Sequence, residues 1–289
     1  MAIASIGILS PGEMGAAVGR SLARRGYSVI AALNGRSERT RTLAAQCGIG
    51  NVGSIDQLVR QCDVVLSILP PSAAAVAAQQ VSAAMRATSA RPLFVDCNSI
   101  APQTARKAAD SLAAAGARFV DAAFVGPPPG GTTLTRLYVS GPDARELRAL
   151  ETDHIEIRVM GEEPGLASAL RICYSAFGEG LLAMAAELLV AAERFGIDEA
   201  LRAEMLETRG TAYEWFMRLL PGIAPQAQRS VREMEEVALA FEAVGLTPKP
   251  FQGVAELYRW IADVQAAKPP SPARGQESGR EFIKRLGQS

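Results

Sequence analysis

Apolar and polar residues change their spacing several times along the first half of the chain. Short apolar runs predict strands, and stretches in which apolar residues recur with helical spacing predict helices between them. The predicted strands are residues 3–9, 29–33, 63–71, 92–99, 118–125 and 135–141, and the predicted helices are residues 13–25, 37–47, 54–62, 73–87 and 102–115. This regular alternation is typical of a doubly wound, mostly parallel sheet with helices on both faces, so the first half is predicted to be an α/β domain.

The second half of the chain has a different pattern. His154 lies in a polar segment that enters a last strand, and after residue 161 only helical spacing remains. Residues 165–194 are predicted to form one long helix, which is apolar all round and is therefore expected to be buried on several sides. Further helices are predicted at residues 199–207, 211–220, 227–244 and 251–264.

These patterns divide the chain into three parts. Residues 1–161 are predicted to form the α/β domain, and residues 162–267 an all-α domain. Residues 268–289 are expected to be a flexible tail, because this segment is proline-rich and then polar.

Composition and charge narrow the function. Among 289 residues, 48% are apolar and 21% charged, with a formal net charge of zero, so no basic excess favours a nucleic-acid partner. The four cysteines are scattered and are expected to be reduced, which favours a cytoplasmic protein. A single histidine makes a metal site unexpected. No signal peptide is recognised and no apolar run reaches the roughly 20 residues of a membrane span, so no membrane partner is expected.

The segment SPGEMG, which follows the first predicted strand, is the main candidate for a binding site. A dinucleotide-binding turn reads G-x-G-x-x-G, and here Ser10 stands at the first glycine, which is tolerable if its φ stays negative. Gly12 would let the backbone approach a diphosphate at a helix N-terminus, and Gly15 would let helix and strand pack closely. The predicted cofactor residues of this turn are Ser10, Pro11, Gly12, Glu13, Met14 and Gly15. A glycine-rich turn without a ligand is the alternative.

The end of the second predicted strand indicates which cofactor is bound. Asn34 stands where a carboxylate would bind a ribose 2′-hydroxyl. Arg36 and Ser37 follow, and an arginine beside a hydroxyl suits a 2′-phosphate. We therefore expect NADP rather than NAD. In the alternative, Arg36 is a solvated loop charge and Ser37 caps a helix.

Several motifs together resemble the β-hydroxyacid dehydrogenase superfamily, which includes 3-hydroxyisobutyrate and 6-phosphogluconate dehydrogenases. SPGEMG resembles the family turn G-L-G-x-M-G, and SILPP, with Leu69 and Pro70, resembles the Leu-Pro loop beside the cofactor. VDCNSIAPQTA, with Asn98 and Ser99, and FVDAAFVGPPPGG, with Phe124, Val125 and Gly126, resemble the two substrate segments. SALRICYSA resembles the helix that carries K-x-x-N-N, and the part of the chain after residue 223 resembles a branch with a phosphogluconate-dehydrogenase-like C-terminal domain.

The resemblance implies a Rossmann domain, an all-α second domain, an active site between them and a homodimer. It also implies hydride transfer between a nicotinamide and a small carbonyl or hydroxy compound, with Asn98 beside both cofactor and substrate. The substrate segments depart from the family pattern, because Val125 replaces a serine and Pro127 a glycine. The proline removes a backbone N–H donor, and Phe124 and Val125 indicate a more apolar pocket, so the substrate is expected to differ from 3-hydroxyisobutyrate. In the alternative, GPPPGG is only a turn-rich loop.

The catalytic position departs further. Arg171 stands where the family has its proton-transferring lysine, and arginine stays protonated in proteins. Tyr174 and Ser175 replace the asparagine pair, and Tyr174 shares a helical face with Arg171. We hypothesise that Tyr174 supplies the proton and that Arg171 is its electrostatic partner. In the alternative, Tyr174 packs in a buried helix and Arg171 forms an ion pair. Two other functions stay open: imine reduction, and binding of NADP without catalysis. Asp121, in FVDAAFV, could be a helix cap or a hydrogen-bond anchor.

Overall fold

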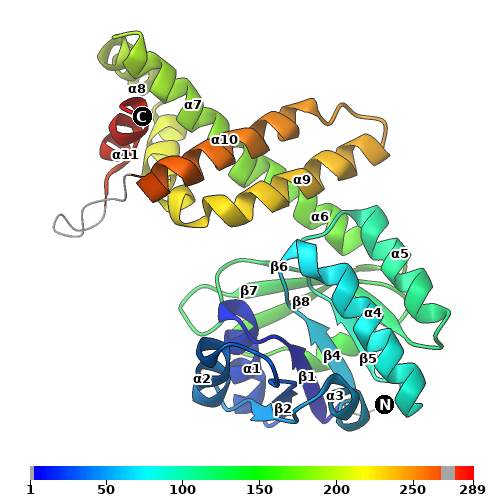
Figure 1. The fold of residues 1–289 in the computed structure, drawn as a ribbon. Helices are drawn as coiled ribbons and strands as arrows, with labels where there is room; N and C mark the ends of the chain where they lie inside the picture. The colour runs from blue at the N-terminus through cyan, green and yellow to red at the C-terminus, as the bar shows by residue number, and fades with distance from the viewer. Residues whose placement is uncertain (1–2, 268–276) are drawn as a thin grey trace. The chain divides into compact units, whose positions relative to one another are not determined.

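The computed structural model describes residues 3–267 and 277–289. The chain forms two compact units, Met1–Ile172 and Cys173–Ser289. Figure 1 follows the chain by colour, from the blue strands and helices of the first unit to the yellow and red helices of the second. The boundary predicted near residue 161 lies at the end of the last strand, whereas the two units divide within the helix that follows it.

The first unit is built on one eight-stranded sheet with the order β3-β2-β1-β4-β5-β6-β7-β8. Neighbouring strands are parallel except β6 and β7. The strands are β1 (Ser5–Leu9), β2 (Ser28–Ala31), β3 (Gly50–Asn51), β4 (Val64–Ser67), β5 (Leu93–Asp96), β6 (Phe119–Val125), β7 (Thr135–Ser140) and β8 (Ile155–Gly161). The predicted mostly parallel sheet is confirmed, and β8 is the strand that the segment after His154 enters.

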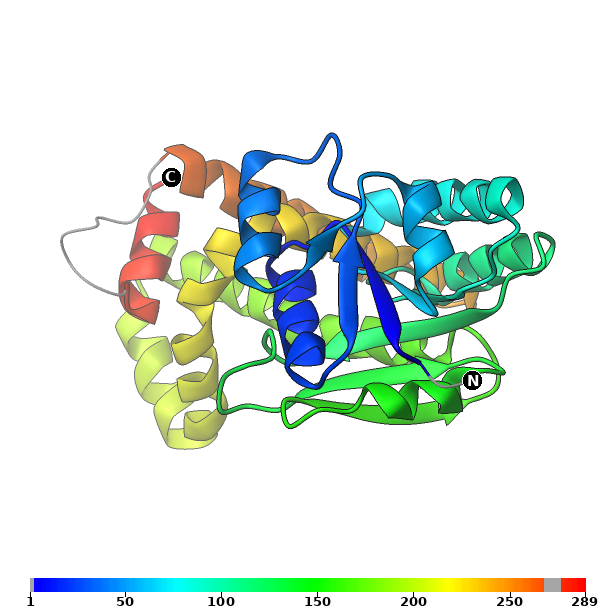
Figure 2. The same cartoon turned by 90° about the horizontal axis from the view of Figure 1, so that it is seen from below.

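Helices cover this sheet on both faces, as Figures 1 and 2 show. They are α1 (Glu13–Arg24), α2 (Glu38–Gln46), α3 (Ile55–Gln61), α4 (Pro71–Thr88) and α5 (Pro102–Ala113), with a 3₁₀ segment, η1 (Ala144–Leu150), before β8. A further helix, α6 (Leu166–Ser175), follows β8 and crosses the boundary between the two units. One apolar cluster joins α1 to the sheet through Val18 and Leu22, and a separate cluster joins α4 and α5 through Met85 and Leu112. The doubly wound α/β class is therefore confirmed.

The second unit is all helical over its described residues. It contains a π-helical turn, η2 (Ala176–Gly180), then α7 (Leu181–Arg194), α8 (Asp198–Leu219), a 3₁₀ segment, η3 (Leu220–Gln226), α9 (Ala227–Ala243), α10 (Lys249–Ala267) and α11 (Gly279–Gly287). The two helices predicted at 199–207 and 211–220 are the halves of α8, which kinks at Arg209 just before Gly210. Glycine is a poor helix former, so a break at this point is expected from the sequence.

The long helix predicted at residues 165–194 exists, but it contains the π turn between α6 and α7. A π turn widens the helix and disturbs its regular hydrogen bonds. The Tyr258 hydroxyl donates a hydrogen bond of 2.9 Å to the carbonyl oxygen of Glu179 within that turn. The buried tyrosine, from a helix far along the chain, therefore satisfies a carbonyl group of the irregular turn.

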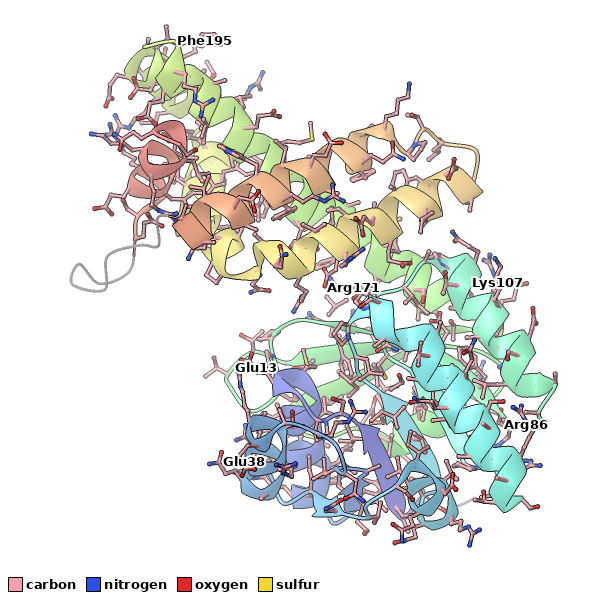
Figure 3. The ribbon with its side chains drawn as sticks, viewed as in Figure 1. Glu13, Glu38, Arg86, Lys107, Arg171 and Phe195 are labelled. Atoms are coloured by element: carbon pink, nitrogen blue, oxygen red, sulfur yellow. The ribbon has the colours of Figure 1, made fainter. Side chains whose placement is uncertain are left out.

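The expectation that this helix is buried on several sides is wrong for one face. Phe177, Leu181, Met184 and Leu188 are all exposed, and Phe195 at the end of α7 is 75% exposed. Figure 3 labels Phe195, which follows the last residue of α7. The first four of these residues recur every three or four positions and Phe195 follows two turns later, so that all five lie on one stripe, which we call the apolar stripe of α7. The segment Leu166–Arg194 also has the length and composition of a membrane span, which is weak evidence because core helices share both properties.

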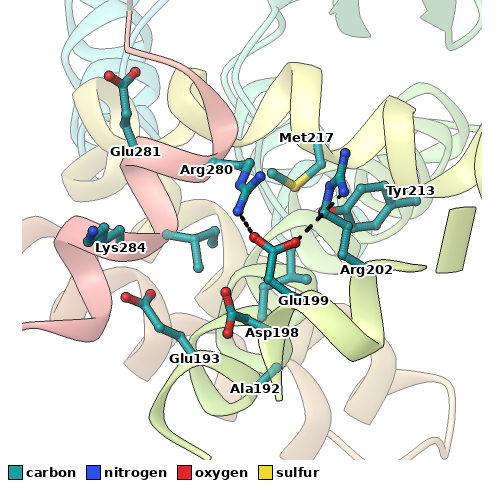
Figure 4. Close-up of a pocket in the computed structure, with 12 residues that line it drawn as sticks. Ala192, Glu193, Asp198, Glu199, Arg202, Tyr213, Met217, Arg280, Glu281 and Lys284 are labelled. Atoms are coloured by element: carbon teal, nitrogen blue, oxygen red, sulfur yellow. Dashed lines mark hydrogen bonds and ion pairs between the residues drawn. The ribbon is translucent and has the colours of Figure 1, made fainter. Parts of the chain in front are cut away.

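The expectation of a flexible tail is wrong for α11. Ser278 caps this helix by accepting a hydrogen bond from the Glu281 amide, and Phe282 and Leu286 are fully buried. Glu199 at the start of α8 is paired with Arg280 of α11 and with Arg202, and Figure 4 draws both pairs as dashed lines. A carboxylate oxygen of Glu199 lies 3.7 Å from a guanidinium nitrogen of Arg202. An amphipathic pattern in a short segment is easily read as polar tail, because its apolar residues are few. Residues 268–276 of the same predicted tail lie outside the described residues.

Candidate cofactor and active site

The turn after β1 has the shape of a phosphate-binding turn. Ser10 has a φ of +54°, so the negative φ that would make a serine tolerable here is not present, and the serine adopts the left-handed conformation that favours glycine. The Gly12 amide donates to the Ser10 carbonyl at 2.7 Å, and Gly12 then becomes the N-cap of α1. No side chain among the described residues caps α1, so its first amide groups point outward with a partial positive charge.

Space above this turn is kept open by Gly12. A Cβ atom built on Gly12 would meet nothing within 4 Å, so a ligand could approach the backbone there. Gly15 is less constrained than expected, because its Cβ would make ordinary contacts of 3.4 Å or more. The closest packing of α1 against its neighbours is at Gly19 instead, where a Cβ atom would lie 2.6 Å from Ile49 Cδ1 and 2.9 Å from Ile8 Cδ1. Met14 is half-buried and packs against the core below the turn.

Asn98 connects the ends of β4 and β5. It is 2% exposed, and its Oδ1 accepts a hydrogen bond of 2.6 Å from the Leu69 amide. Its Nδ2 donates to Ser67 Oγ at 2.9 Å. Asn98 therefore holds the loop that carries Leu69 and Pro70, and Pro70 in turn is the N-cap of α4. Direct contact of Asn98 with cofactor or substrate stays a prediction.

A cavity of about 530 Å³ opens beside these loops, between the segments that follow β2 and β4. Its lining includes three of the predicted cofactor residues, namely Asn34, Arg36 and Leu69. The lining also includes residues that the sequence did not indicate, among them Gly53, Ser54, Ile55, Val76 and Gln80. In doubly wound sheets, ligands bind beyond the carboxyl ends of the strands where the strand order reverses, and here it reverses between β1 and β4.

Ser37 is the N-cap of α2. Its Oγ accepts a hydrogen bond of 3.3 Å from the Thr40 amide, so the capping role given as an alternative is present. Arg41 donates to the Arg36 carbonyl and pairs with Glu38 at 2.7 Å. The hydrogen bond and charge of Arg41 hold the pKa of Glu38 below its ordinary value. Arg36 is half-buried at the cavity, and its binding of a 2′-phosphate stays a prediction.

The structure brings Arg171 and Ser99 together. Arg171, labelled in Figure 3, lies on α6 and its Nε donates to Ser99 Oγ at 3.2 Å. This contact joins two segments that are 72 residues apart in the sequence and that were both predicted as part of the active site. Further along the same helix, Tyr174 is 55% exposed and Ser175 is buried. The packing alternative for Tyr174 is therefore weakened, since more than half of the side chain is open.

The end of β6 holds the other predicted substrate residues. Phe124 is half-buried, Val125 is buried, and Gly126 has a φ of +114° with its Cβ position 3.4 Å from the Leu134 carbonyl. Thr135 Oγ1 donates to the Pro127 carbonyl at 2.6 Å, which fixes the loop after β6. Gly126 is therefore required by the turn itself, and a substrate role for Phe124, Val125 and Gly126 stays a prediction.

Asp96, at the end of β5, is a titratable group that the sequence did not single out. It is 1% exposed, and its Oδ1 accepts a hydrogen bond of 2.9 Å from the Asn98 amide. Within the described part of the chain, its Oδ2 has no hydrogen-bond partner. Burial raises the pKa of Asp96 to about 7, and the charge of Asp121 on the adjacent strand contributes in the same direction. Asp96 thus lies directly beneath the loop that carries Asn98 and Ser99.

Comparison with known proteins agrees with this geometry. Residues 2–151 match the family model described as the NAD binding domain of 6-phosphogluconate dehydrogenase. Residues 192–261 match a model described as a domain of unknown function (DUF1932). The 3-hydroxyisobutyrate dehydrogenase of Pseudomonas aeruginosa PAO1 is 28% identical over 239 residues, which cover 78% of this chain and 77% of that protein.

Solved structures share the fold over nearly the whole chain. A conserved protein reported to be structurally similar to 3-hydroxyacid dehydrogenases is 30% identical, with a TM-score of 0.70 over 90% of this chain and 97% of that one. The 3-hydroxyisobutyrate dehydrogenase of Mycobacterium tuberculosis has a TM-score of 0.68 at 22% identity, covering 99% of each chain. An imine reductase variant of Myxococcus stipitatus with NAD⁺ has a TM-score of 0.59 at 19% identity, also covering 99% of each chain.

Proposed function

This chain belongs to the family that has the NAD binding domain of 6-phosphogluconate dehydrogenase, and it is an NAD(P)-dependent oxidoreductase of the 3-hydroxyacid dehydrogenase type; we propose that its cofactor is NADP and its substrate a small carbonyl or hydroxy compound. The observation that carries the proposal is the uncapped N-terminus of α1 beneath the open space at Gly12. A helix N-terminus of this kind suits a diphosphate, because its free amides and dipole both favour an anion.

Arg36 supports the choice of NADP over NAD. It lines the cavity together with Asn34, whose neutral amide replaces the carboxylate that would favour a free 2′-hydroxyl. A guanidinium can donate two hydrogen bonds to a phosphate, and such charge-assisted bonds are the strong ones. Glu38 in the first turn of α2 would oppose a nearby phosphate, but its pairing with Arg41 offsets much of that charge.

Titration of the purified protein with NADPH and NADH, followed by nucleotide fluorescence, tests the cofactor. We expect tighter binding of NADPH, and Arg36→Ala should weaken NADPH binding about 10- to 100-fold while leaving NADH unchanged, since a hydrogen bond to a charged group contributes roughly 1.5–3 kcal/mol. Arg39→Ala is the matched control, because Arg39 is exposed outside the cavity lining. Equal affinities for the two nucleotides would refute the choice of NADP, and binding of neither would refute the site.

When bound, the cofactor gives or takes the hydride through its nicotinamide. The residues of this chain would then stabilise charge on the substrate oxygen or nitrogen and move a proton. Arg171 is a fixed cation that can polarise a carbonyl group, and Tyr174 on the same helix can supply the proton. Tyr174→Phe should lower turnover by about 100-fold or more, the usual contribution of a positioned acid or base. Near-normal turnover would remove Tyr174 from the scheme.

Imine reduction is the second candidate activity. It is favoured by the presence of Arg171 at the position of the family lysine and by the fold shared with an imine reductase. A panel of small 3-hydroxy acids, carbonyl compounds and cyclic imines, assayed with NADPH and NADP, distinguishes the two. Turnover of any member excludes binding without catalysis, and binding with no turnover would favour it.

We also propose a homodimer in the cytoplasm, without nucleic-acid or membrane partners. The apolar stripe of α7 supports the dimer, because an exposed apolar helix face in a globular protein is usually covered by a partner. Three of the four cysteines are buried and all four are free, which suits a reducing compartment.

A further inference from the structure

Asp121, in the middle of β6, lies at the start of the helix that carries Arg171. It is 1% exposed, and its Oδ2 accepts hydrogen bonds from the amides of Gly165 and Ser168 at 2.9 and 3.0 Å. Its Oδ1 accepts a hydrogen bond of 2.5 Å from Ser168 Oγ. The buried side chain of Asp121 thus accepts hydrogen bonds from amides at the N-terminus of α6, where the helix dipole favours a negative charge.

Ser140 of β7 completes this anchor. Its Oγ donates to Asp121 Oδ2 at 2.9 Å and accepts a hydrogen bond of 3.1 Å from the Ala167 amide. Gly165 also lies against α5, because a Cβ there would be 3.1 Å from the Pro102 carbonyl. The first turn of α6 is therefore fixed to β6, β7 and α5 together, and any rotation or shift of the helix would break several buried hydrogen bonds.

Arg171 follows Ser168 by one helical turn, on the same face and about 4.5 Å further along the axis. Its Nε reaches Ser99, which lies on the loop that Asp96 and Asn98 hold. Asp96 and Asp121 are register partners on the adjacent strands β5 and β6. Asp96 therefore holds the loop of Ser99, and Asp121 holds the helix of Arg171, from neighbouring positions of one sheet. The direction and reach of Arg171 depend on where α6 begins.

We propose that Asp121 is a positioning residue for the reaction, which fixes the start of α6 and thereby the contact of Arg171 with Ser99. This inference rests on the proposed function for its effect on turnover, but not for its effect on Arg171. The contact is small and directional, so a displacement of about 1 Å is enough to lower turnover as much as 100-fold.

The position of Arg171 can be observed without a substrate. In the ¹⁵N spectrum of the full chain, the Nε–H signal of Arg171 is assigned by its loss in Arg171→Lys. We expect Asp121→Ala to shift or broaden this signal and to speed amide exchange at Gly165, Ala167 and Ser168. Asp121→Asn should largely restore both, because its amide oxygen can still accept from the same N–H groups.

Asp63 offers a matched control at the amino end of β4. Its Oδ2 also accepts three hydrogen bonds of 2.8–2.9 Å, from the amides of Ala4 and Ser5 and from the Ser5 hydroxyl. Asp63→Ala should therefore cost similar hydrogen bonds and leave the Arg171 signal unchanged. If Asp121→Ala does not fold, Ser168→Ala removes one donor of the anchor and should produce a smaller shift. An Arg171 signal that is the same in wild type and in each folded variant of the anchor would overturn the proposal.

Turnover separates positioning from general damage. With a substrate from the panel, Asp121→Ala should lower kcat about 10- to 100-fold while the Kd for NADPH stays the same. In an Arg171→Ala background the same change should alter kcat less than about 2-fold, because the residue through which it acts is gone. An equal loss in both backgrounds would show that Asp121 acts independently of Arg171 and would overturn the positioning role. If no substrate is turned over, the proposed function fails and the spectrum of Arg171 still decides the positioning role.

Discussion

Ser10 has a backbone conformation that suits glycine better than serine. Its φ of +54° lies in the left-handed region, where a side chain costs roughly 1–2 kcal/mol. No hydrogen bond of the Ser10 side chain is found among the described residues to offset that cost. The conformation allows the Gly12 amide to donate to the Ser10 carbonyl at 2.7 Å, which closes the turn before α1.

Ser10→Gly should therefore raise the free energy of unfolding by about 0.5–1 kcal/mol, the strain relieved less the added freedom of the unfolded chain. The measurement is the midpoint of urea denaturation. Ser54→Gly is the opposite case, since Ser54 has a negative φ and caps α3, so its replacement should destabilise. A loss of stability in Ser10→Gly would show that the serine makes an interaction that outweighs its strain.

Asp96 should make stability depend on pH. Its pKa in the fold is about 7 against 3.8 in the unfolded chain, so the folded protein holds a proton that the unfolded chain has lost between these values. Stability should therefore fall as pH rises from about 4 to about 7, by at most about 4 kcal/mol, and change little above that range.

Asp96→Asn, which cannot ionise, should lose this pH dependence, as measured by urea denaturation at several pH values. Asp63 should contribute a pH dependence of stability in the opposite direction. Hydrogen bonds from Ala4 and Ser5 lower its pKa, so its contribution to stability is lost as pH falls through that lowered pKa. A difference between wild type and Asp96→Asn that stays constant from pH 4 to pH 8 would contradict the raised pKa.

Part of the site can be predicted from single residues and part cannot. Gly12 in SPGEMG, Arg36 after the second strand and Arg171 in its motif are recognisable as candidates from local spacing, and their roles stay predictions. The use of Asn98 to hold the Leu69 amide is not, since it depends on two strands that are neighbours only in the folded sheet. The oxygen of Asp96 that has no hydrogen-bond partner among the described residues cannot be predicted from the sequence either, because burial and partner geometry depend on the tertiary fold.

At the scale of elements, the sequence predicts a helix more reliably than the interruptions within it. Within the π turn between α6 and α7, a carbonyl group is hydrogen-bonded by Tyr258, which is 79 residues from Glu179 in the sequence. The kink of α8 is different, because Gly210 marks it locally. The short helix α11 was missed because its helix-capping serine follows a proline-rich stretch that by itself indicates a linker.

The helix α11 should contribute to the stability of the second unit. Leu286 is fully buried. Leu286→Ala should therefore lower the free energy of unfolding by about 2–5 kcal/mol, the usual cost of a cavity in a packed core. Leu246, which is 55% exposed, gives the matched control, and Leu246→Ala should change stability by less than about 0.5 kcal/mol. Thermal unfolding of the two variants measures the difference, and equal effects would mean that α11 is only loosely held.

At the scale of the whole molecule, the apolar stripe of α7 predicts association of two chains. Leu188→Glu places a charge in the stripe, and burying that charge without a partner is costly, so the variant should be monomeric. Val244→Glu is the control, because Val244 is 72% exposed at the end of α9 and lies outside the stripe. Light scattering at micromolar concentration gives the mass of each. A monomeric wild type would refute the dimer.

The close approach at Gly19 has a consequence for the mouth of the site. Because Ile8 and Ile49 pack against this glycine, the distance of α1 from the sheet is set about two turns beyond the phosphate-binding end. A methyl group at this position would come closer to both isoleucines than packing allows, so either these side chains or α1 with its N-terminal amides would have to move. Gly19, which lies outside the predicted cofactor residues, thus helps to set the position of the amides that would bind a diphosphate.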